Sequence, residues 1–79
     1  MVVVHREAGL RVIIFRDDHD PPHVHVFGDG ETKIELGDNP GEIRIAYSIN
    51  AKRNEKRRAE SAVRANHAVL LERWRELHG

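Results

Sequence analysis

The sequence predicts an α+β fold: a small antiparallel β-sheet of three to five strands, followed by one long or kinked C-terminal α-helix packed on one face. Two observations support this fold class. Residues 1–50 contain short apolar or alternating stretches separated by Gly, Pro and Asp, as in strands joined by turns. Residues 51–79 contain no Pro and only the terminal Gly79, and their apolar side chains recur every three or four positions. The whole chain, residues 1–79, has the length of one small domain.

Five stretches in the first half have the composition of strands. They are residues 2–4, 10–15, 23–27, 32–36 and 43–47. Glu7-Ala8-Gly9 suits a hairpin between the first two stretches, and Gly28-Asp29-Gly30 predicts an antiparallel hairpin between the third and the fourth. Residues 17–22 are rich in Asp and Pro and interrupt the pattern, because Pro cannot donate to a strand ladder.

The second half has the pattern of a helix. Asn50 is the expected N-cap, with Ser48 as the competing choice. The apolar stripe includes Val63, Leu70 and Trp74, and Trp74 is the expected core anchor. A break near Asn66-His67 is an alternative, but the stripe keeps its phase across that point, so a single helix is favoured.

Composition narrows the classes of protein that the chain can belong to. The absence of cysteine excludes disulfides, thiolate metal sites and a cysteine nucleophile. No apolar run is long enough to span a bilayer and no signal-peptide pattern follows Met1, so we expect a cytoplasmic protein. The formal net charge is zero, but residues 1–50 carry −4 and residues 51–79 carry +4. Such a split favours an electrostatic contact, either between the two halves or with an anionic partner.

A histidine cluster is the first candidate site. His23 and His25 occupy alternate positions of one expected strand and therefore share a face. His19, Asp18 and Asp20 precede them, so a site for a divalent transition metal ion is one interpretation. The alternative is that both histidines lie on the solvated face of a half-exposed sheet and bond to the loop aspartates or the backbone.

A basic run at the start of the helix is the second candidate site. Its cations are Lys52, Arg53, Lys56, Arg57 and Arg58. Because the apolar stripe begins only at Ala59, we expect the first two turns to extend beyond the sheet. Clustered cations and free N–H groups at a helix N-terminus suit the phosphates of nucleic acid. A solvated helix face, or a contact with the acidic half or with a partner, explains the run equally well.

Residues 18–26 read Asp-His-Asp-Pro-Pro-His-Val-His-Val, and this motif resembles the core of the bacterial domain of unknown function 4160 family. The resemblance continues through Lys33-Ile34-Glu35-Leu36 to a helix with Asn66-His67 and Trp74, and so covers nearly the whole chain. The resemblance implies a bacterial cytoplasmic protein of a regulatory or toxin–antitoxin-like kind. It also implies a small partner protein encoded in the same operon. It implies no reaction and assigns no catalytic residue.

Two functions from different classes follow. The first is a small regulatory or interaction protein that contacts nucleic acid or a partner protein. The alternative is a metal-dependent or histidine-based enzyme that acts on a small or phosphorylated substrate, with a second subunit as one source of further ligands. The position of the basic run relative to His23 and His25 distinguishes them: convergence favours phosphate chemistry, and separation favours binding.

Overall fold

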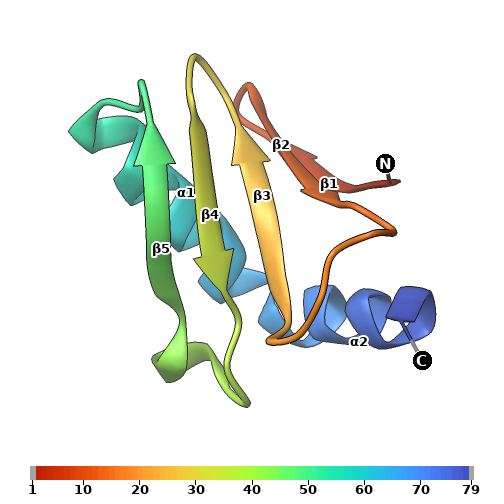
Figure 1. Ribbon diagram of the computed structural model, residues 1–79. Coiled ribbons are helices and arrows are strands. Elements are labelled where there is room, and N and C mark those ends of the chain that lie inside the picture. Colours follow the sequence, from red (N-terminus) through yellow and green to blue (C-terminus); the bar gives the residue numbers. More distant parts are fainter. Residues whose placement is uncertain (1, 79) are drawn as a thin grey trace.

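The computed structural model describes residues 2–78. The chain folds into a five-stranded antiparallel sheet with two helices packed behind it (Figure 1). The strands are β1 (Val2–Glu7), β2 (Leu10–Ile14), β3 (His23–Phe27), β4 (Glu31–Glu35) and β5 (Arg44–Ile49). Their order in the sheet is their order in the chain, so every strand pairs with the one that precedes it. The α+β class and the number of strands agree with the prediction. Strand ends differ by up to three residues.

The turns explain how the chain reverses. Ala8 and Gly9 both have positive φ, 49° and 79°, as the tight turn between β1 and β2 requires. A short 3₁₀ helix, Pro40–Glu42, lies in the longer connection between β4 and β5. Gly30 lies so close to the backbone of Ile49 and Asn50 that a Cβ atom there would collide with it. The β3–β4 turn is therefore packed directly against the chain that leaves β5.

Alternation along the strands separates a core face from an open face. Val24 and Val26 of β3 point towards the helices and are fully buried, together with apolar side chains of β2 and β4. Val63, Leu70 and Trp74 reach this core from the helices, as the apolar stripe predicts. We call the other side of the sheet, which the helices do not cover, the open face (Figure 1).

The helical half is broken into α1 (Arg53–Ala65) and α2 (His67–His78), which run in different directions (Figure 1). The single helix favoured by the sequence analysis is therefore wrong, and its alternative, a break near Asn66-His67, is confirmed. The side-chain amide of Asn66 donates to the carbonyl of Ala62 at 2.8 Å and so competes with the helical backbone bond. The buried ring of His67 bonds to the carbonyl of Leu36 at 2.8 Å, which holds the start of α2 at the end of β4. No helix among residues 2–78 combines the length and apolar character needed to cross a bilayer.

Two predictions about the helix start are also wrong. The N-cap is Lys52, without a side-chain cap bond, because Asn50 has φ of 55° and turns the chain out of β5. The first turn does not extend beyond the sheet: Glu55 is 3% exposed, and its carboxylate accepts the backbone N–H groups of Asp29 and Gly30 at 2.8 and 3.2 Å. This buried carboxylate ties α1 to the β3–β4 turn.

Candidate metal centre

The two strand histidines lie side by side on the open face. Their ring centroids are 5.1 Å apart, and Phe15 meets the ring of His25 edge-on at 4.8 Å. The ring of His23 also lies 5.0 Å from that of Trp74. His23 is only 3% exposed and His25 only 7% exposed. The solvated part of the alternative interpretation is therefore wrong, because the segment between β2 and β3 covers both rings and Trp74 packs on His23. Its other part, rings in contact with a loop aspartate and the backbone, is confirmed.

Asp18 comes from this covering segment and faces both histidines. A turn holds it in place, in which the backbone N–H of Asp18 donates to the carbonyl of Phe15 at 3.1 Å. Its Oδ2 atom accepts the backbone N–H of Phe15 at 3.1 Å. The same oxygen lies 3.3 Å from Nε2 of His23 and 3.4 Å from Nε2 of His25. One carboxylate oxygen is thus shared between two imidazoles.

The opposite ring nitrogens also lie against hydrogen-bond acceptors. Nδ1 of His23 lies 2.8 Å from the carbonyl of Pro21, and Nδ1 of His25 lies 3.1 Å from Oε2 of Glu31. A carbonyl and a carboxylate only accept hydrogen bonds, so a proton on each Nδ1 satisfies Pro21 and Glu31. In that neutral tautomer both Nε2 atoms direct lone pairs at the Asp18 carboxylate, which is favourable only with a cation between them; protons on the Nε2 atoms would instead give ion pairs with Asp18. Protein metal sites orient their histidine ligands in the first way, with a carbonyl or carboxylate behind each ring.

With the protons on Nδ1, three electron-pair donors face one another across a small space. The ligand atoms of Asp18, His23 and His25 all lie within 4.8 Å of one another. Nε2 of His25 is buried and has no hydrogen-bond partner among the described residues. Buried polar atoms without a partner are rare in folded proteins. A cation in the space between the three atoms would satisfy all of them at once.

Glu31 and Tyr47 support the cluster from behind, and the sequence analysis did not identify either residue. The hydroxyl of Tyr47 donates to Oε2 of Glu31 at 2.8 Å, the same atom that accepts from His25. Partial desolvation, and then the hydrogen bond to Glu31, raise the pKa of the Tyr47 hydroxyl, so it remains a donor at neutral pH. The register of the β3–β4 hairpin could have identified Glu31. The turn pairs Glu31 with Phe27, which neighbours His25 on the same face of the sheet.

The other metal candidates lie outside this cluster. His19 and Asp20 are exposed and are not part of the three-residue group. The remaining histidines have other partners: His67 bonds to Leu36, His5 lies 2.7 Å from a Glu7 oxygen, and His78 bonds to the carbonyls of Trp74 and Phe15. The five candidates proposed from the sequence therefore reduce to Asp18, His23 and His25.

The basic run does not converge on the histidines. It lies at the start of α1, on the helix side of the sheet (Figure 1). The histidines alternate with Val24 and Val26, which face the helices, so they lie on the open face. Arg53, Lys56 and Arg57 line a shallow pocket of about 290 Å³ between α1 and β5. Arg58 donates to the carbonyl of Ala8 at 2.9 Å, and Lys52 is exposed. By the criterion of the sequence analysis, this separation favours a binding function for the basic run over a phosphate-chemistry site made from both features.

The comparisons with known proteins yield one result. A sequence model of a protein family, described as Domain of unknown function (DUF4160), matches residues 9–75. The match includes the covering segment, both histidines and most of the two helices. The searches of curated proteins and of solved structures produced no significant match.

Proposed function

The chain belongs to the DUF4160 family, and from the geometry of its own site we propose that it is a metal-dependent protein, with one divalent transition-metal ion bound by Asp18, His23 and His25. The observation that carries this proposal is the unpartnered Nε2 atom of His25, which is buried and faces two further donors. Imidazole nitrogen with one carboxylate oxygen suits zinc, nickel, cobalt and ferrous iron.

The number of ligands favours a reactive centre over a closed structural one. Structural zinc sites use four protein ligands, whereas catalytic sites use three and keep a position for water or substrate. A metal ion bound by Asp18, His23 and His25 would hold such a position on the side of Asp18, whose side chain is 17% exposed. In that position it would activate water or polarise a small substrate. Such a centre corresponds to the metal-dependent form of the enzymatic alternative with a small substrate, while the separate position of the basic run argues against a phosphorylated one.

Metal titration of the purified chain tests the proposal. We expect one zinc, nickel or cobalt ion per chain by isothermal titration and elemental analysis. His25→Ala and Asp18→Asn should each weaken binding by at least tenfold. The matched controls are His19→Ala and Asp20→Asn, which remove donors of the same kind outside the cluster and should leave affinity within twofold. Equal binding by wild type and by a His23→Ala, His25→Ala double variant would remove the proposal.

A second candidate function is the regulatory one, with a protein partner held at the β5 edge. β5 is the last strand of the sheet, so its outer backbone groups have no strand partner among the described residues. Ile49 is 53% exposed on this strand, and the exposed Arg53 and Arg57 lie beside the pocket between β5 and α1. An extended acidic segment could pair with the edge and place carboxylates on the two arginines.

Co-expression with the product of the neighbouring gene tests this second function. We expect a complex on size-exclusion chromatography that an Arg53→Glu, Arg57→Glu double variant abolishes. Arg64→Glu is the matched control, since Arg64 is exposed on the same helix at its other end. A complex that survives the double variant and fails with Arg64→Glu would contradict the assignment to this edge.

A further inference from the structure

Side chains on the open face form rows that run across the strands, and the strand register defines which residues share a row. One row across the sheet contains Arg6, Arg11, Phe27, Glu31 and Ile49. The next row contains Val3, Ile13, His25, Lys33 and Tyr47. The segment between β2 and β3 covers the histidine end of this face. Cationic, aromatic and apolar side chains occupy most of the remainder.

The carboxylates of Glu35, Glu31 and Asp18 on the open face already contact other side chains of that face. Glu35 accepts two bonds from the guanidinium of Arg44, the shorter at 2.6 Å. Glu31 accepts from Tyr47 and His25, and Asp18 faces the two histidines. None of these acids therefore neutralises the cations of the first row.

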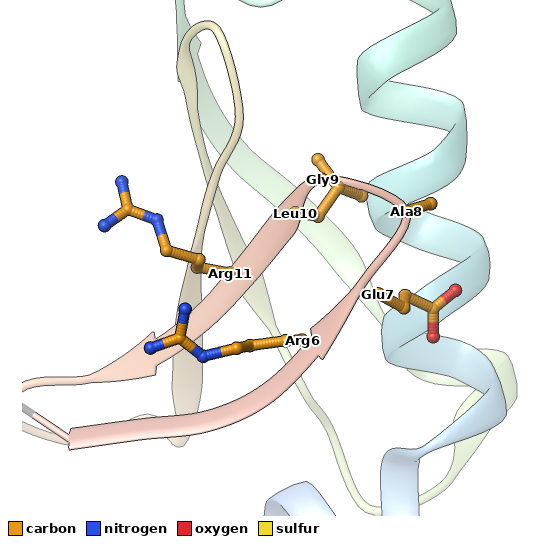
Figure 2. Close-up of a pocket in the computed structure, with 6 residues that line it drawn as sticks. All are labelled: Arg6, Glu7, Ala8, Gly9, Leu10 and Arg11. Atoms are coloured by element: carbon orange, nitrogen blue, oxygen red, sulfur yellow. The ribbon is translucent and has the colours of Figure 1, made fainter.

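Three cations of this face have no carboxylate within ion-pair distance among residues 2–78: Arg6, Arg11 and Lys33. Arg6 and Arg11 are directly paired across β1 and β2, which is repulsive for like charges. Figure 2 shows both guanidinium groups on the same side of the hairpin, whereas Glu7 points the other way. They line an open surface pocket of about 400 Å³ formed by residues 6–11. An anion between the two arginines would relieve their repulsion.

Arg11 and Lys33 each lie over one face of an aromatic ring. The guanidinium of Arg11 is 5.9 Å from the ring centroid of Phe27, and the ammonium of Lys33 is 5.9 Å from that of Tyr47. Phe27 is partly exposed and Tyr47 is 40% exposed. Flat rings with adjacent cations match a strand of nucleotides, because each base can stack on a ring while its phosphate meets the cation.

We propose that single-stranded nucleic acid binds across the open face, with its phosphates on Arg6, Arg11 and Lys33 and its bases on Phe27 and Tyr47. Duplex nucleic acid does not fit, because its bases are stacked on one another and cannot reach the rings. This surface is separate from the basic run on α1 and does not require a metal ion, so it stands independently of the proposed function.

Fluorescence anisotropy with a labelled oligothymidylate and the full chain tests the proposal. We expect binding that weakens with salt, and an Arg6→Gln, Arg11→Gln double variant should reduce the slope of log K against log salt by about 1.4. Phe27→Leu should weaken binding about 5- to 150-fold, which is the usual contribution of one stacked base. Tyr47→Phe keeps the ring and should bind like wild type, whereas Tyr47→Leu should not.

The matched control is an Arg53→Gln, Arg57→Gln double variant, which removes the same charge from the helix side of the sheet. Thermal melting of every variant establishes that it is folded. Loss of binding in this control, with binding intact in the Arg6 and Arg11 variant, would overturn the proposal, and so would no binding by wild type at low salt. Equal affinity for the duplex of the same sequence would also overturn it, because stacking would then contribute nothing.

Discussion

Removal of the buried carboxylate of Glu55 should destabilise the protein more than any other change to an acidic side chain of α1. Glu55→Ala removes the acceptor for two backbone N–H groups, those of Asp29 and Gly30. A hydrogen bond to a charged acceptor contributes about 1.5–3 kcal/mol, so two bonds at the lower end give about 3 kcal/mol. A chain of this length has a free energy of unfolding of about 4–12 kcal/mol. The expected loss is thus a quarter or more of the total.

Thermal and urea unfolding followed by circular dichroism measure this effect. A loss of about 3 kcal/mol should lower the Tm by about 12–24 °C in a domain of this size. Glu55→Gln keeps one acceptor oxygen without the charge, and about half of the loss should be recovered. Glu60→Ala is the matched control on the same helix and should change stability by less than about 0.5 kcal/mol. If the Tm of Glu55→Ala lies within about 2 °C of the wild-type Tm, the carboxylate does not hold the turn.

Three further predictions concern the core, a turn and a titration. Trp74 is 3% exposed and packs against His23, so Trp74→Ala should cost about 3–5 kcal/mol in urea unfolding; an unchanged midpoint would contradict its place in the core. Gly30→Ala should reduce the yield of folded protein, because its Cβ would collide with the backbone at Ile49 and Asn50; wild-type circular dichroism and melting would argue against that close approach. Tyr47 is the one tyrosine of the chain, so ultraviolet absorbance reports its ionisation directly. The pKa of Tyr47 should lie above the ordinary value of about 10. The stability that the neutral hydroxyl contributes should be fully present below a pH of about 10 and should be lost as the pH rises through the raised pKa. Glu31→Gln should bring this pKa back down, and no movement would exclude Glu31 as a cause.

The sheet was predictable because its signal is local. Apolar β-branched runs located the first two strands, alternation located the last three, and the Gly28-Asp29-Gly30 turn indicated the β3–β4 hairpin. The break between α1 and α2 was not predictable from periodicity, because the apolar stripe continues through it. It depends on Asn66 and on the bond from His67 to Leu36, a partner 31 residues earlier in the chain.

The candidate site was predictable in its histidines and not in its carboxylates. Strand alternation places His23 and His25 on one face whatever the rest of the fold does. Spacing cannot choose among Asp18, His19 and Asp20, because the conformation of the covering segment decides which side chain turns inward. Glu55 was unpredictable for a related reason: charged residues in the first turn of a helix are normally solvated, and only the packing of α1 on the β3–β4 turn buries this one.

The sequential order of the strands has a consequence for how fast the site can assemble. Every strand pairs with its predecessor, so closing each pair costs little loop entropy, and chains with such local pairing fold quickly. The three proposed ligands lie within eight consecutive residues, from Asp18 to His25. A metal ion could therefore be captured by a short stretch around β3 while α1 and α2 are still undocked. The proposed ion would then act during folding as well as afterwards, by holding the segment that leads into β3 against that strand.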